Sequence, residues 1–192
     1  SGNYQFEKPL LSWPSRGMPA HLSAFYNSQD IREGCMGRGW SHTYMVSLST
    51  MSDATRVITW GDGLQERYTP KEGGGFNPPP GVFDTLTWNG GQGTYTLRTK
   101  YGTEYLFTAR NLWKAVLSTI TDKNGNVITL NYNASGVMTG ITDTVGRNFT
   151  FTYTNGKLTS ITDPANRSVT FTYTWGLITE ITDPMSNTTQ YG

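Results

Sequence analysis

Large apolar and small polar residues alternate in three matching segments in the second half of the chain. Ile128, Leu130 and Tyr132 alternate with threonine and asparagine, and the same order returns at 149–153 and 169–173. Alternation with a period of two is typical of a β-strand that buries one face. The β-branched and aromatic residues in these segments suit a pleated, half-buried surface. We therefore predict a strand at each segment.

The predicted strands belong to a repeat. The triplet Ile-Thr-Asp begins each unit, at residues 120, 141, 161 and 181, so the units are 20 or 21 residues long. A fixed period of this size is the mark of a repeat architecture, in which each unit buries its apolar face against its neighbours. The fourth unit stops halfway, at Tyr191 and Gly192. We expect the chain to be part of a longer array.

Each unit contains a hairpin turn after the alternating strand. Asn155-Gly156 is a strong signal for a two-residue type I′ turn, because both central positions of that turn need φ > 0. Gly136 and Gly176 hold the matching place in the units on either side.

An aspartate begins the second turn of every unit. Pro164 follows Asp163, and this order suits the first two positions of a type I turn. The role of turn initiator explains the whole set without a metal ion, although a calcium ladder is the alternative. The four aspartates are Asp122, Asp143, Asp163 and Asp183.

Apolar residues in the return strands are spaced by three rather than by two. The pairs are Met138 and Ile141, Leu158 and Ile161, and Ile178 and Ile181. A regular strand would direct the two members of a pair to opposite faces. Either both faces are covered or a β-bulge redirects one side chain, and we favour the bulge.

These elements predict an all-β fold, in which consecutive antiparallel β-hairpins form one long curved sheet after an irregular N-terminal β-region. The expected domains are a β-rich pre-repeat region at 1–116 and the repeats at 117–192. The entry is expected to be rich in loops because Pro9, Pro14 and Pro19 interrupt it. Strands are predicted at 21–26 and 41–48, with one helical turn within 109–116.

The repeat units and the segment before them resemble a known family. Residues 156–173 are similar to the YD repeats of the Rhs family, which includes bacterial polymorphic toxins, toxin-complex components and teneurins. Gly37–His42 lies in a stretch, 10–48, that resembles the segment preceding such repeats. The family's tyrosine is present at Tyr132, Tyr153 and Tyr173, whereas the aspartate after it is replaced by asparagine or threonine.

The resemblance implies a structural role. In Rhs-type proteins the repeats form a hollow β-cage around a C-terminal toxin domain, so the expected partner is the remainder of the same polypeptide, and the expected location is secreted or on the surface of a bacterium. The family's autoproteolytic motif is not in this sequence. No enzyme activity is expected, and the important residues are structural: Tyr132, Tyr153, Tyr173, Ile141, Ile161, Ile181, Asp163, Pro164 and Gly156.

Tryptophans suggest an alternative, a cell-surface module that binds a glycan or a protein partner. Aromatic planes stack on the apolar faces of sugars, although filling the core of an aromatic-rich β-fold is the expected role for most of the six tryptophans. Trp175 is the exception, because it lies at a hairpin tip. Possible ligand contacts are Trp175, Trp88, Trp60 and the glycine- and proline-rich loop 73–80.

Charge and motifs argue against other classes. Charged residues make up 15% of the chain and the net charge is +1, so nucleic acid is a poor candidate ligand. No apolar run is long enough to span a bilayer, and the single cysteine, Cys35, excludes an internal disulfide. Ser41-His42, and Asp62 with Glu66, lack the spacing of a recognisable catalytic set. We expect no catalytic, cofactor or metal site.

The incomplete fourth unit has a further consequence. If the parent array continues, an open edge strand remains at the end of this chain, and open edges pair with other chains. We expect edge-to-edge self-association or poor order of the last residues.

Overall fold

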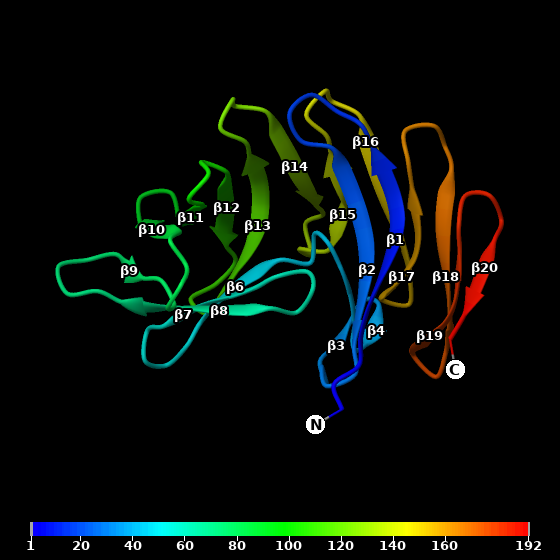
Figure 1. Ribbon diagram of the computed structural model, residues 1–192, viewed down its shortest axis with the longest axis horizontal. Coiled ribbons are helices and arrows are strands. Elements are labelled where there is room, and N and C mark those ends of the chain that lie inside the picture. Colours follow the sequence, from blue (N-terminus) through cyan, green and yellow to red (C-terminus); the bar gives the residue numbers. More distant parts are fainter. Residues whose placement is uncertain (1, 192) are drawn as a thin grey trace.

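A computed structural model describes residues 2–191, which form twenty strands and no helix, so the all-β prediction is confirmed (Figure 1). The strands of the pre-repeat region are β1 (Gln5–Trp13), β2 (Ala20–Asn27), β3 (Glu33–Gly34), β4 (Gly37–Arg38), β5 (Trp40–His42), β6 (Ser47–Thr50), β7 (Arg56–Thr59), β8 (Gln65–Pro70), β9 (Phe76–Asn77), β10 (Thr85–Asn89), β11 (Thr94–Arg98) and β12 (Glu104–Ala109). The strands that follow are β13 (Lys114–Thr121), β14 (Val127–Tyr132), β15 (Met138–Thr142), β16 (Asn148–Thr154), β17 (Lys157–Thr162), β18 (Ser168–Thr174), β19 (Leu177–Thr182) and β20 (Thr188–Gln190).

One sheet of 15 strands contains all the repeats. Its strands β13 to β20 pair antiparallel in sequence order, so each unit adds one hairpin beside the previous one, as predicted. Strand β20 is the last in this order among the described residues. The self-association expected from that edge stays a prediction, and Gly192 lies outside the described residues.

A β-bulge recurs in every unit and explains the spacing of three. Thr152 pairs with Ser160 and Tyr153 with Leu158, which leaves Thr159 as the extra residue. Equivalent shifts leave Thr139 and Thr179 extra in the neighbouring hairpins. The bulge turns both apolar members of each pair inward, so Leu158 and Ile161 are both fully buried. The preference for a bulge is confirmed.

The sheet divides at β13. Residues 119–121 of this strand pair with β14, whereas residues 114–116 pair with β6 of the pre-repeat region. The other side of β13 pairs with β12 along its length. The two predicted domains therefore share a sheet, and the boundary at 117 stays a prediction.

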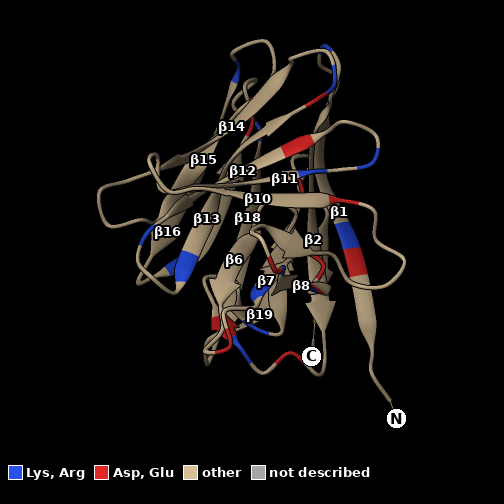
Figure 2. Cartoon of the chain, turned by 90° about the vertical axis from the view of Figure 1, so that its left-hand side faces the viewer, with Lys and Arg blue, Asp and Glu red and all other residues tan. Residues whose placement is uncertain are grey.

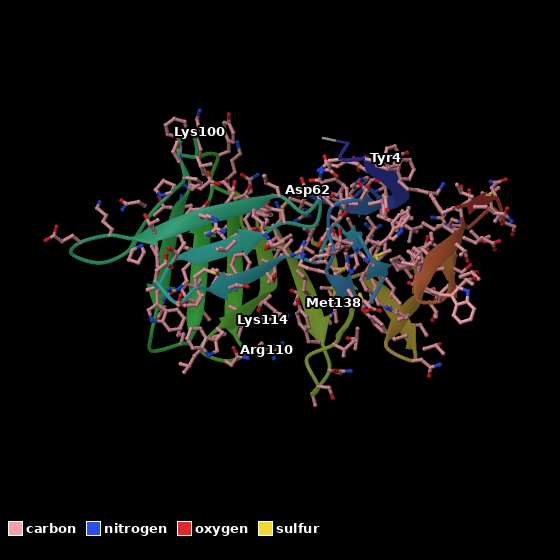
Figure 3. All side chains as sticks on the ribbon, turned by 90° about the horizontal axis from the view of Figure 1, so that it is seen from below. Tyr4, Asp62, Lys100, Arg110, Lys114 and Met138 are labelled. Carbon is pink, nitrogen blue, oxygen red and sulfur yellow. The ribbon has the colours of Figure 1, made fainter. Side chains whose placement is uncertain are left out.

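A second layer covers the repeats. Strands β1, β2 and β5 form a separate sheet, and β1 and β2 lie in front of β15 to β17 in Figure 1. Side chains fill the space between the layers in Figure 3, where Tyr4 and Asp62 lie on the opposite side of the molecule from Arg110 and Lys114. The common core includes the buried Leu22, Leu48 and Phe107. It also includes the repeated isoleucines Ile141, Ile161 and Ile181, each fully buried.

Three local predictions were wrong. Residues 5–13 form β1 rather than a loop, and Pro9 fits because β1 is an edge strand with a register shift just after this residue. The predicted strand at 41–48 is two strands, because the chain turns after His42. No helical turn is present within 109–116, where a tight connection leads into β13 through the bond from the Arg110 N–H to the Lys114 carbonyl.

Candidate functional site

Four equivalent turns connect the strands at one end of the repeat sheet and form a row there. We call it the aspartate-turn row (residues 122–126, 143–147, 163–167 and 183–187). In the third turn, Oδ1 of Asp163 accepts hydrogen bonds from the backbone N–H groups of Ala165 and Arg167, at 2.9 and 3.0 Å. The Asn166 N–H donates to the Asp163 carbonyl at 3.0 Å, which closes the predicted turn. The same pair of bonds to Oδ1 occurs at Asp122, Asp143 and Asp183.

Asp163 is 3% exposed and its second oxygen is also bonded. Oδ2 accepts from Nε of Arg167 at 2.8 Å and from Nε1 of Trp13 at 3.0 Å. Burial acts to raise the pKa of the Asp163 carboxyl, but the hydrogen bonds from Arg167, Trp13 and Ala165 together outweigh it and hold the pKa below its usual range. The carboxylate therefore stays ionised and works as a structural acceptor.

The N-terminal segment 8–17, which we call the strap, crosses the four units one after another. A Cβ added to Gly17 would lie 2.2 Å from Oδ2 of Asp122, so only glycine permits this approach to the first unit. In the second unit, the hydroxyl of Thr144 donates to the Arg16 carbonyl at 2.6 Å. Trp13 reaches Asp163 in the third unit. The ammonium of Lys8 donates to the Thr189 hydroxyl in the fourth unit, at 2.8 Å.

Trp13 is the central contact of the strap. The guanidinium carbons of Arg147 and Arg167 lie 4.9 and 5.4 Å from the centre of its ring system. Phe149 packs edge-on against the same side chain, with centroids 6.5 Å apart. Two cation–π contacts and one hydrogen bond thus join a single strap residue to two successive units.

Sequence reasoning missed the strap. Its signal was present, because an arginine follows the aspartate by four residues at Arg147 and Arg167, and asparagine takes that place at Asn126 and Asn187. A side chain at this spacing returns to the carboxylate in every turn. The pattern shows a local pairing that recurs in each unit, but it does not show that Trp13 would lie on two of the arginines.

The repeated tyrosines join neighbouring hairpins. The hydroxyl of Tyr132 donates to the Leu117 carbonyl at 2.7 Å, and that of Tyr173 donates to the Leu158 carbonyl at 2.6 Å. Tyr153 is half-buried against the same core. Burial raises the pKa of Tyr132 to about 12 and also raises the pKa values of Tyr153 and Tyr173, so the hydroxyls remain protonated donors at neutral pH.

A second row of turns connects the strands at their opposite ends, and we call it the hairpin-tip row (110–113, 133–137, 155–156 and 175–176). Asn155 and Gly156 have φ of 51° and 76°, which agrees with the predicted type I′ turn. Trp175 and Gly176 have nearly the same values, 55° and 80°. A bulky residue rarely adopts this conformation, and Trp175 is 97% exposed.

The other tryptophans divide between core and surface. Trp40 is buried, and Trp13 and Trp60 pack partly against the core, Trp60 edge-on to Tyr105 at 5.1 Å. Trp88 is 45% exposed and packs at a tilt against Tyr95, with ring centroids 4.3 Å apart. Trp113 is 60% exposed. The expected core role therefore holds for only three of the six, and the candidate contacts Trp175, Trp88 and Trp60 lie apart on different elements.

The residues considered for catalysis have structural partners. The Ser41 hydroxyl donates to the Gly61 carbonyl at 2.5 Å, whereas His42 is buried and its Nδ1 accepts from the Tyr44 N–H at 3.2 Å. Burial lowers the pKa of His42 to about 3, so the ring is neutral. Asp62 accepts the Leu64 N–H at 2.9 Å, and Glu66 accepts the Tyr68 hydroxyl at 3.1 Å. These contacts do not assemble a nucleophile with a base.

Charged residues of both signs are interspersed along the chain, as Figure 2 shows. Within residues 2–191, no group of three or more His, Cys, Asp or Glu side chains is placed to hold a metal ion. The same residues contain no helix that is long and apolar enough to cross a membrane.

Comparisons with known proteins match both parts of the chain. Residues 1–68 match DUF6531, a domain of unknown function, and residues 153–188 match the RHS Repeat family. The chain is 33% identical over 139 residues to the tRNA3(Ser)-specific nuclease WapA of Bacillus spizizenii and 34% identical over 139 residues to the tRNA nuclease WapA of Bacillus subtilis. Each alignment covers 72% of this chain but only 6% of the relative.

The family match falls on the structural features described above. Residues 153–188 contain two complete aspartate turns, the tyrosine contact at Leu158 and the type I′ turn at Trp175. The earlier match, residues 1–68, includes the strap that crosses the repeats. With its repeated hairpins and the tyrosine at the same place in each unit, the chain belongs to the Rhs/YD-repeat family.

Proposed function

We propose that this chain is a non-catalytic structural segment of an Rhs/YD-repeat shell that encloses a C-terminal toxin or effector. The observation that carries this proposal is that one interface is used repeatedly. Each hairpin contains the same bulge and pairs with the next hairpin in the same register through the same aspartate turn, so further units extend the sheet without a new kind of contact. The partner is then the remainder of the same polypeptide.

In this proposal, catalysis belongs to another part of the whole protein. The relatives are named as tRNA nucleases, but this chain aligns with only 6% of their length. The titratable residues described above are engaged in turns, in the core or in ion pairs. We therefore propose that any nuclease activity of the whole protein belongs to a part beyond the aligned region, and that the protein acts outside the cell or at the surface of a bacterium.

The experiment is to find the size and protection of the native polypeptide. An antibody raised against this 21.3 kDa chain is used on extracts and medium of the source cells. We expect a product many times larger, together with a separate C-terminal fragment that resists added protease until the shell is denatured. A free-standing product of about the size of this chain would overturn the proposal, because so few units do not enclose a cavity.

A second candidate function is glycan binding at the cell surface. The exposed side chains of Trp175 and Trp88 favour it, since flat aromatic faces stack on sugars. A glycan screen with Trp175→Ala and Trp88→Ala tests it. Binding that both substitutions leave unchanged, or no binding to any glycan, would count against this candidate.

A further inference from the structure

A hollow of about 330 Å³ lies where the β7–β8 hairpin meets the N-terminal sheet. This volume is at the lower end of the range of about 300–1,000 Å³ that is typical of small-molecule sites. Figure 3 marks the place with the label of Asp62, on the same side of the molecule as Tyr4. The side chains that matter for a ligand are Phe25, Trp60, Asp62, Leu64 and Glu66. All of them belong to the pre-repeat region, so no residue near the end of the chain shapes the hollow.

The floor of the hollow is held by close backbone contacts. A Cβ added to Gly61 would lie 2.5 Å from the carbonyl oxygen of His42 and 2.7 Å from that of Thr43, so only glycine permits this approach. The Ser41 hydroxyl donates to the Gly61 carbonyl at 2.5 Å and adds a polar contact at the same place. The hairpin is therefore fixed against the segment that follows β5, and the hollow has a defined shape before any ligand arrives.

Apolar side chains supply one part of the lining. Trp60 and Phe25 contribute aromatic rings, and Leu64, which is 56% exposed, adds an aliphatic surface. The indole of Trp60 lies edge-on to the ring of Tyr105, with centroids 5.1 Å apart, and this contact limits its rotation. Flat aromatic rings pack well on the C–H face of a pyranose. This part of the hollow therefore suits a sugar ring.

Two carboxylates supply the polar part of the lining, and each has one oxygen free. Oδ1 of Asp62 accepts the Leu64 N–H at 2.9 Å, and Oε2 of Glu66 accepts the Tyr68 hydroxyl at 3.1 Å. Within residues 2–191, the second oxygen of each carboxylate accepts no hydrogen bond, and neither group forms an ion pair. The described lining also contains no lysine, arginine or histidine. Two negative charges thus face the hollow without a cation beside them.

This combination selects the charge of the ligand. Free carboxylate oxygens beside aromatic rings favour a cationic group, which gains charge-assisted hydrogen bonds and contact with the ring faces. We infer that the hollow binds a sugar that carries a free, protonated amino group. Its ring packs against Trp60 and Phe25, and its ammonium and hydroxyl groups donate to the free oxygens of Asp62 and Glu66. An ammonium group has three donors and no acceptor, so it matches a lining of this kind.

The inference goes beyond the shell function, because it gives the pre-repeat region a ligand of its own. It rests on the second candidate function, glycan binding, and specifies the class of sugar and a different surface. Neither Trp175 nor Trp88 lines this hollow. Substitutions of these two tryptophans therefore distinguish the amino-sugar site from glycan binding elsewhere on the chain.

The test uses the purified 192-residue chain, labelled with ¹⁵N, and a trisaccharide of glucosamine. NMR titration in mildly acidic buffer, where the sugar amine is protonated, follows the indole N–H of Trp60, assigned with Trp60→Phe. We expect a saturable shift of this signal and no shift of the Trp113 indole, which does not line the hollow. The matching trisaccharide of N-acetylglucosamine should bind about 10-fold more weakly, because it has the same rings without the charge.

Variants of the acids keep the shape of the hollow. Asp62→Asn and Glu66→Gln retain an oxygen to accept the Leu64 N–H and the Tyr68 hydroxyl, so each removes a charge without removing a structural bond. Each should weaken binding of the glucosamine trisaccharide about 5-fold. The matched control Glu72→Gln removes an exposed acid that does not line the hollow, and affinity should not change. Equal thermal midpoints for the three variants check that the fold is intact.

Absent binding, equal affinity for the two trisaccharides, or unchanged affinity in both Asp62→Asn and Glu66→Gln would overturn the amino-sugar site. Equally strong binding of lysine amide would assign the hollow to cationic side chains of a protein partner and overturn it too. Binding that is lost in Trp175→Ala or Trp88→Ala, but kept in the acid variants, would support the second candidate function while overturning this site. The size of the native polypeptide tests the shell separately, and neither result decides the other.

Discussion

The two rows of turns, which lie at opposite ends of the strands of the repeat sheet, differ in almost every respect. In the aspartate-turn row all four carboxylates make the same backbone bonds, and the strap contacts each unit. In the hairpin-tip row the connections vary in length, and the side chains at the tips range from Asn155 to Trp175. Exposed apolar residues are found in this row, including Leu112, Trp113 and Trp175.

This difference shows that a repeat protein can place its stabilising turns at one end of the strands and leave the residues at the other end free to vary. A turn whose donors and acceptors are all satisfied within five residues stabilises each unit independently, and the strap then joins the units. The tips are free to vary because a two-residue turn needs only the right backbone angles. Trp175 has these angles although a bulky residue rarely adopts them, and its side chain is exposed. We therefore place a candidate contact site at Trp175 rather than among the aspartates.

The largest effect is expected in the core that lies beneath both rows. Ile161→Ala removes a fully buried side chain and leaves a cavity, so the free energy of unfolding should fall by about 3 kcal/mol. Urea denaturation followed by tryptophan fluorescence measures it. The control Thr152→Ala, on the exposed face of β16, should change stability by less than about 0.5 kcal/mol. Equal losses of stability in the two variants would mean that the repeated isoleucines are not part of the core.

A paired substitution compares the rows directly. Asp163→Ala leaves two backbone donors, Arg167 and Trp13 without their acceptor, and should lower the free energy of unfolding by about 3 kcal/mol. Asn155→Ala in the tip row should cost only about 1 kcal/mol, since it affects the backbone preference alone. Circular dichroism checks that both variants fold. A larger loss at Asn155 would reverse the distinction between the rows.

Acid should weaken the aspartate-turn row selectively. The pKa of Asp163 is lower in the folded chain than in the unfolded chain, so its contribution is present above the unfolded value of about 4 and is lost as the pH falls through the folded pKa. Asp143 is shifted in the same direction. Thermal unfolding between pH 7 and pH 2 should show a falling midpoint below pH 4, with a shallower fall for Asp163→Asn. Identical slopes would exclude this carboxylate as a cause.

The smallest expected change is a gain in stability on substitution at the tip of the β18–β19 hairpin. Trp175→Asn should raise the free energy of unfolding by about 1 kcal/mol, because it relieves a strained backbone without removing a buried contact. Chemical denaturation at two protein concentrations measures it and also detects association through the indole. A loss of stability would show that Trp175 already packs within this chain.

The repeats were predictable because their information is local. Strict alternation, Asn155-Gly156 and Asp163 each act within a few residues, so the strands, the type I′ turn and the aspartate turn were all confirmed. The bulge was also visible in the spacing of Leu158 and Ile161. The candidate site was less predictable. Trp175 was singled out correctly as an unburied tip, but exposure of Trp88 and Trp113 was not separable from a core role by sequence.

The all-β class, the period of the repeat and the two kinds of turn follow from the order of residues along the chain. That residues 8–17 form a strap, that β13 pairs with both β14 and β6, and that Trp13 contacts both Arg147 and Arg167 is visible only in the folded molecule. The physical reason is distance along the chain. Period and turn chemistry are set by neighbouring residues, whereas the Trp13–Asp163 bond joins positions 150 residues apart, and no local pattern encodes which of the four units each strap residue meets.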